Sequence, residues 1–209
     1  MSSKSVAVIT FSTRTPRVGP EVAALVKEAL EKDAEASDLQ LSPVDVADFK
    51  LPVFDEPVIP AMVPAAASFS HQHSIAWSDE IKKHAAYVLV IPEYNYGMAG
   101  GTKNAIDYLK NEWTGKPAVI VSYGIKGGTS ASEQLEHSLN LMGLRIAATR
   151  PALAFAENRG PEMETPTFGG KIGPKTREDW LEKGTVEILK AFGELKELLS
   201  QEPPPPKEH

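Results

Sequence analysis

The chain has 209 residues, of which 42% are hydrophobic and 24% charged, which suits one ordinary globular domain and excludes collagen-like, coiled-coil and wholly disordered chains. Its formal net charge of −6 argues against a groove that follows a nucleic-acid backbone. The lack of cysteine excludes disulfide scaffolds, cysteine-ligated metal centres and thiol nucleophiles. The apolar run at 6–11 is too short for the ~7–15-residue core of a signal peptide, and no run approaches the ~20 apolar residues of a membrane span. We therefore expect a cytoplasmic protein that binds neither membrane nor nucleic acid.

Short β-branched runs alternate with helical patterns along the chain. Strands are expected at 6–11, 39–46, 87–91, 117–121 and 144–148. Helices are expected at 19–32, 77–83, 102–111, 130–142 and 176–199. Irregular structure is expected at 50–68, at 92–101 and at 157–175, where Pro, Gly or Ala is frequent. Residues 1–200 are predicted to form one domain, and the Pro-rich segment 201–209 a disordered tail.

Near-continuous apolar strands that alternate with helices are typical of a parallel sheet covered on both faces. The sequence therefore predicts an α/β fold with a doubly wound, five-stranded parallel sheet. In such sheets ligands bind beyond the carboxyl ends of the strands, where the strand order reverses. The loops after the first, third and fourth strands are thus the places to look for a binding site.

The first of these loops, 12–17, combines hydroxyl and guanidinium groups just before a helix. Ser12, Arg14 and Arg17, followed by Val18, could bind a phosphate together with backbone N–H groups and the positive end of the helix dipole. The alternative is an ordinary turn with solvated arginines. The loop matches neither the G-x-x-x-x-G-K-[ST] nor the G-x-G-x-x-G pattern, which disfavours nucleoside triphosphatases and standard dinucleotide sites.

The other two loops suit a flat heteroaromatic ligand. The run Pro92-Glu93-Tyr94-Asn95-Tyr96 offers aromatic stacking area beside an amide, on a glycine-rich backbone. The alternative is a surface loop whose tyrosines pack on the core. After the fourth strand, glycines let the backbone approach a ligand closely. This loop contains Ser122, Tyr123, Gly124, Gly127 and Gly128.

Taken together, these motifs resemble the NAD(P)H-dependent FMN reductase family, which includes NAD(P)H:quinone reductases. The resemblance rests on Ser12-x-Arg14, on 92–97 with the following 103–107, and on 113–117 leading to 122–124. It covers roughly residues 5–150. The sequence departs from the family pattern at Phe11, where a Gly usually precedes the Ser, at 99–102, and at Ile125.

The resemblance implies a flavodoxin-like sheet of order 2-1-3-4-5 and a bound FMN, with NAD(P)H as co-substrate. It assigns the FMN phosphate to the loop that begins at Ser12 and the isoalloxazine to 92–96 and 122–124, with Gly127 and Gly128 nearby. It further implies electron transfer to a small acceptor, a quinone or free flavin, and a homodimer or possibly a tetramer. No obligate catalytic residue is predicted, because the cofactor carries the chemistry.

Two other functions remain open from the sequence alone. One is a flavodoxin-type electron carrier without a nicotinamide site, and the other is a regulatory protein whose partner binding follows the flavin redox state. The pair His71 and His73 could suggest a metal, but two His at this spacing without a carboxylate more often lie in a polar loop, and no metal is predicted.

Overall fold

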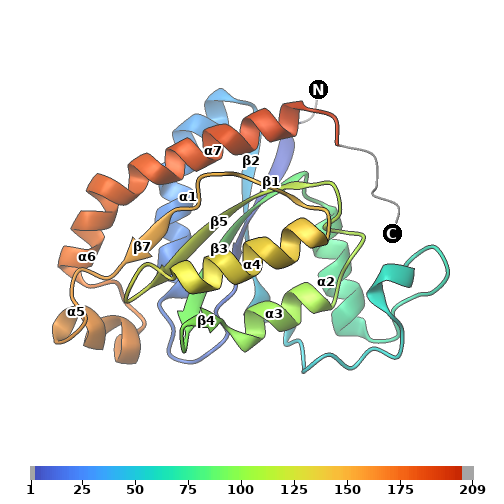
Figure 1. Ribbon diagram of the computed structural model, residues 1–209, viewed down its shortest axis with the longest axis horizontal. Helices are drawn as coiled ribbons and strands as arrows, with labels where there is room; N and C mark the ends of the chain where they lie inside the picture. The colour runs from blue at the N-terminus through green and yellow to red at the C-terminus, as the bar shows by residue number, and fades with distance from the viewer. Residues whose placement is uncertain (1–2, 204–209) are drawn as a thin grey trace.

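A parallel sheet of order β2-β1-β3-β5-β6 forms the centre of the computed structural model, which describes residues 3–203 (Figure 1). Its strands are β1 (Lys4–Thr10), β2 (Leu39–Asp45), β3 (Ala86–Tyr94), β5 (Pro117–Gly124) and β6 (Arg145–Ile146). β4 (Gly97–Met98) pairs antiparallel with β3, and β7 (Ala152–Ala154) pairs parallel with β5. Counted along the main path, the parallel strands follow the order 2-1-3-4-5, so the predicted fold class is confirmed.

Helices cover both faces of the sheet. They are α1 (Gly19–Ala36), α2 (Gln72–Lys82), α3 (Gly100–Asp107), α4 (Thr129–Leu141), α5 (Pro161–Glu164), α6 (Pro174–Asp179) and α7 (Thr185–Ser200). Short 3-10 turns lie at Val46–Phe49 and Pro60–Met62, and π-helical turns lie at Thr165–Gly169 and Trp180–Gly184. Within residues 3–203, none of the helices combines the length and apolar character needed to cross a bilayer.

The central strands β1, β3 and β5 are apolar on both sides because each face of the sheet has its own core. In β1, Val6 and Val8 pack with α1 and α7, whereas Ala7 and Ile9 pack with α2, α3 and α4. All four side chains are at most 1% exposed, as expected for a strand buried on both faces. In the central strands, polar atoms available for binding are therefore found at the strand ends and in the loops that follow them.

The structure differs from the predicted elements in several places. The helix predicted at 77–83 runs from Gln72 to Lys82, so His73 lies in a helix rather than in a polar loop, and the helix predicted at 102–111 ends at Asp107. β3 runs on to Tyr94 and turns back into β4, so 92–101 is a hairpin in part rather than a loop. The strand predicted at 144–148 is reduced to β6, and β7, which the sequence did not predict, follows at Ala152–Ala154; both pair with β5. The segment 157–175 contains α5 and a π-helical turn, and the last predicted helix is divided by a second π-helical turn. The predicted tail, 201–209, lies outside the described residues from 204 onward.

Candidate functional site

A cavity of about 440 Å³ lies among the loops at the carboxyl ends of β1, β3 and β5. Three predicted loops contribute to its lining. From them come Arg14, Arg17, Val18, Pro92, Glu93, Tyr94, Asn95, Tyr123 and Gly124. The sequence therefore predicted correctly which loops meet at one place, and the volume lies within the range of small-molecule sites.

A fourth wall of the cavity comes from a segment that sequence reasoning missed. Phe155, Met163, Pro166 and Thr167 line it, together with Ile125 from the loop after β5. For residues 157–175 the sequence predicts only irregular structure. The one local signal is the position of Phe155, which directly follows a strand of the sheet.

The start of α1 has the features of an anion site. No side chain caps this end of the helix in the part of the chain that the structure describes. Beside it lie the hydroxyls of Ser12 and Tyr123, which are buried and have no hydrogen-bond partner among residues 3–203. Gly19 makes the approach possible, because a methyl group there would overlap the Ser12 hydroxyl and lie 2.8 Å from that of Tyr123. An uncapped helix N-terminus carries the positive end of the helix dipole, which favours an anion here.

The two arginines of this loop have different surroundings. Arg17 donates to both carboxylate oxygens of Asp45, at 2.9 and 2.7 Å, and to the Ser12 carbonyl at 2.8 Å. The Asp45 hydrogen bond, opposed by burial, raises the pKa of Arg17. Arg14 is exposed and makes one long bond, of 3.3 Å, to the Thr167 carbonyl. Arg17 therefore braces the loop, while most donors of Arg14 remain available.

The loop after β3 is a two-residue hairpin turn. Tyr94 pairs with Gly97, and the central residues Asn95 and Tyr96 have φ of 50° and 59°. Positive φ at both central positions defines the type I′ turn that suits a tight hairpin. Asn tolerates this conformation, but it is strained for a tyrosine. Tyr96 is 80% exposed and lies at the tip, outside the cavity lining, whereas Tyr94 and Asn95 face it.

Glu93 lines the cavity but its carboxylate is already engaged. Its Oε2 accepts hydrogen bonds from the backbone N–H groups of Ser130 and Ala131, at 3.0 and 3.3 Å, in the first turn of α4. A carboxylate at a helix N-terminus is stabilised by the dipole. Glu93 thus fixes the hairpin against α4 rather than presenting a free charge to a ligand.

Three residues predicted to bind the cofactor, Ser122, Gly127 and Gly128, do not line the cavity but determine the conformation of the loop after β5. The Ser122 hydroxyl is buried and donates to the Gly127 carbonyl at 2.7 Å. Gly128 has φ of 73°, and a Cβ there would lie 2.9 Å from the backbone N and O of Tyr123. These residues hold the turn closed so that Tyr123 and Gly124 reach the cavity.

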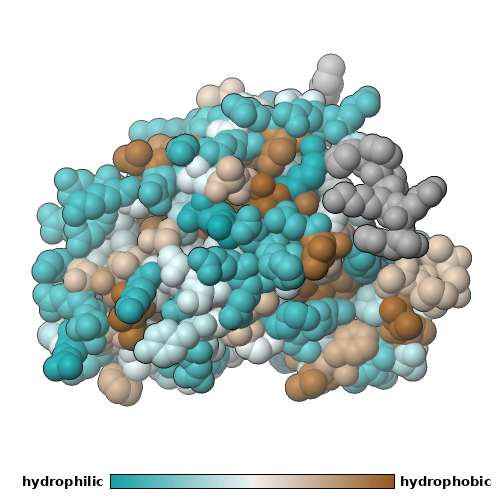
Figure 2. Space-filling model, in the orientation of Figure 1, coloured by the Kyte–Doolittle hydropathy of each residue, from teal (hydrophilic) through white to brown (hydrophobic). Residues whose placement is uncertain are grey.

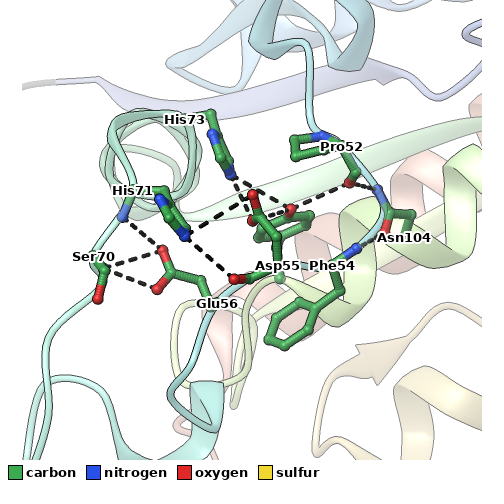
Figure 3. A network of polar contacts seen from close by, with 9 residues as sticks. Pro52, Phe54, Asp55, Glu56, Ser70, His71, His73 and Asn104 are labelled. Atoms are coloured by element: carbon green, nitrogen blue, oxygen red, sulfur yellow. Dashed lines mark hydrogen bonds and ion pairs between the residues drawn. The ribbon is translucent and has the colours of Figure 1, made fainter.

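A separate polar cluster organises the segment between β2 and α2 (Figure 3). His73 Nε2 lies 2.9 Å from Asp55 Oδ1, and the Tyr108 hydroxyl donates to the same oxygen at 2.8 Å. Burial and the Asp55 hydrogen bond raise the pKa of Tyr108 to about 12. Asn104 adds bonds to the Pro52 carbonyl and the Phe54 N–H. These contacts attach the irregular segment to α2 and α3.

Comparison with known proteins identifies the family. The model of the NADPH-dependent FMN reductase family matches residues 5–158. The chain belongs to this family. It is 49% identical to an NAD(P)H-dependent FMN reductase of Nectria sp over 94% of this chain and 97% of that protein. A quinone reductase of Escherichia coli is 31% identical over 82% of this chain and 86% of its own length. The flavoenzyme FerB of Paracoccus denitrificans shares the fold, with a TM-score of 0.61 and 22% identity over 91% of this chain and 97% of its own.

Family membership confirms the main functional prediction from the sequence. The protein is an FMN-dependent oxidoreductase that uses NAD(P)H, and its acceptors are small molecules. The residues present fit the phosphate of FMN, because the uncapped start of α1 has the unpartnered Ser12 hydroxyl beside it, although Ser12 itself does not line the cavity. Phe11, one of the departures from the family pattern, has its side chain buried in the core with α2, α3 and α4.

Proposed function

We propose that this protein binds FMN in the cavity and passes hydride from NAD(P)H through it to a quinone or a free flavin. The observation that carries the proposal is the anion site at the start of α1, where the buried hydroxyls of Ser12 and Tyr123 have no partner among residues 3–203. A buried polar group without a partner costs stability unless a ligand or water completes it. The FMN phosphate has the acceptor oxygens to do so.

The chain's own residues bind and orient the cofactor. Ser12, Arg14 and the N–H groups up to Val18 would hold the phosphate, with Arg17 fixing the loop through Asp45. The isoalloxazine would lie along 92–95 and against Gly124 and the backbone of Tyr123, which line the same cavity, while the Tyr123 hydroxyl lies at the start of α1. Tyr96, Ser122, Gly127 and Gly128 would act by shaping the two turns. Bound FMN supplies the two-electron chemistry, so that NAD(P)H, one proton and a quinone give NAD(P)+ and the quinol.

The quaternary and cellular proposals follow the sequence predictions. We propose a homodimer with the flavin close to the subunit interface, for which the exposed Tyr96 beside the cavity is a supporting feature. Sedimentation equilibrium over a range of concentrations tests it, and a single monomeric species would contradict it. That residues 1–200 form one domain stays a prediction, which limited proteolysis tests. The cytoplasmic location also stays a prediction, which cell fractionation tests.

Steady-state oxidation of NADH and NADPH by the FMN-loaded protein tests the proposed function. The expected result is rapid oxidation that depends on both FMN and an added quinone or free flavin. An electron carrier would instead accept electrons only from a separate reductase and would leave NAD(P)H unoxidised. Loss of activity on removal of FMN, with recovery on its return, is the control that ties the rate to the cofactor.

A further inference from the structure

The fourth wall of the cavity, residues 155–172, is here called the wall segment. It leaves the sheet at the end of β7, where the Phe155 N–H donates to the Gly124 carbonyl at 3.2 Å. The family match ends at residue 158, so most of the wall segment, including Met163 and Pro166, lies beyond the part shared with the family model. The cavity is thus lined mainly by the loops after β1, β3 and β5, and the wall segment closes its remaining side.

The wall segment is held rigidly on its outer side. Glu162 is only 6% exposed, and its carboxylate accepts bonds from Lys175 N, Thr176 N and Thr176 Oγ1 at 3.2, 2.9 and 2.6 Å. These bonds cap the start of α6. Because Met163 follows Glu162 directly, this anchor fixes where the Met163 side chain enters the cavity.

Two further anchors join the wall segment to the phosphate loop and to α1. Glu21 in the first turn of α1 accepts from the Ile172 N–H and from Lys171 Nζ, both at 2.7 Å. Arg14 donates to the Thr167 carbonyl. The wall segment is therefore positioned by the same helix start that would hold the cofactor phosphate.

The surface that the wall segment turns toward the cavity is mostly apolar. Phe155 packs on Trp180, with ring centroids 5.5 Å apart, while Met163 is half-buried and Pro166 is buried. The charged groups of the lining are committed elsewhere, since Arg17 pairs with Asp45 and Glu93 caps α4. When Arg14 binds the FMN phosphate, no charged group of the lining is left to pair with a charged electron acceptor. The wall segment then contacts the electron acceptor through apolar side chains.

We propose that the wall segment selects the electron acceptor, and that Met163 is its specificity-determining residue. The acceptor class it fits is a flat, uncharged aromatic ring system, such as a two-ring quinone, in preference to a phosphorylated free flavin. An unbranched thioether side chain adapts its shape to a planar ring and contacts it favourably. This inference rests on the proposed function, because it assumes that FMN binds against the loops after β1, β3 and β5.

The test compares Met163→Ala, Met163→Leu and a matched control, Met62→Ala, in the FMN-loaded protein. Met62 is 47% exposed and does not line the cavity. A redox-inactive naphthalene amide is titrated into each oxidised protein and followed by the change in flavin absorbance. The KM for a naphthoquinone, the KM for ferricyanide and the dissociation constant of FMN are measured alongside.

Met163→Ala should weaken the naphthalene amide and raise the naphthoquinone KM about fivefold, as expected when a few tens of Å² of apolar contact are lost. Ferricyanide, a polyanion that needs no apolar contact, and FMN should be unaffected. Met163→Leu should restore most of the affinity, and Met62→Ala should match the wild type. An unchanged naphthalene affinity, or an equal loss of FMN affinity, would overturn the inference while the proposed function stands. A wild-type protein that does not retain FMN would overturn the proposed function itself.

Discussion

Replacing Arg14 by alanine should remove affinity for the FMN phosphate without disturbing the fold. Arg14 is exposed, and its one hydrogen bond, to Thr167, is 3.3 Å long, so we expect the free energy of unfolding to change by no more than about 0.5 kcal/mol. A charge-assisted bond to phosphate contributes roughly 1.5–3 kcal/mol. Loss of that bond corresponds to FMN binding that is about 10- to 100-fold weaker.

Fluorescence titration of the FMN-free protein with FMN and with riboflavin measures this difference. Riboflavin lacks the phosphate, so Arg14→Ala should leave its affinity unchanged. Arg17→Ala is the matched control: it breaks the double contact with Asp45 and the bond to the Ser12 carbonyl, and should lower the melting temperature and the affinity for both ligands. An equal loss of riboflavin and FMN affinity in Arg14→Ala would refute the assignment of Arg14 to the phosphate.

Three more predictions follow from the geometry. Gly128→Ala should destabilise the protein by about 1–3 kcal/mol in chemical denaturation, because φ is 73° and the new Cβ would press on the Tyr123 backbone; wild-type stability would contradict the assigned turn. Burial raises the pKa of Glu162, but the hydrogen bonds from Thr176 and Lys175 outweigh it and lower the pKa below its usual 4.5. The ionised carboxylate therefore stabilises the folded protein, and this stability is lost as the pH falls through the folded pKa. Glu162→Gln should therefore show a flatter decline in melting temperature from about pH 5 to about pH 3, and an unaltered profile would argue against the anchor. With one cavity for both substrates, double-reciprocal plots at several acceptor concentrations should be parallel, and intersecting lines would indicate a ternary complex.

The sequence predicted the architecture and three of the four cavity walls because both depend on local patterns. Apolar strands followed by helices define the sheet, and polar or glycine-rich loops at the strand ends mark where a ligand can bind. The β3–β4 hairpin was not predicted, because a tyrosine at φ of 59° is not a usual turn residue. Its strand partner, Gly97–Met98, is also too short to give a periodic signal.

The fourth wall could not be predicted because long-range contacts determine it. Glu21 binds the Ile172 N–H across 151 positions of the chain, and nothing near either residue indicates the pairing. The sequence also could not show which charged residues of the predicted loops contact a ligand and which make structural contacts. Glu93 and Arg17 have the charges expected of ligand contacts, yet the structure engages them with α4 and with Asp45.

The central claim is that one FMN binds per chain with its phosphate at the start of α1. Titration of the FMN-free protein, followed by gel filtration, measures it most directly. The account predicts that the protein retains absorbance at ~450 nm at a ratio close to one flavin per chain, and that inorganic phosphate competes with FMN. A protein that elutes colourless from an excess of FMN would contradict it.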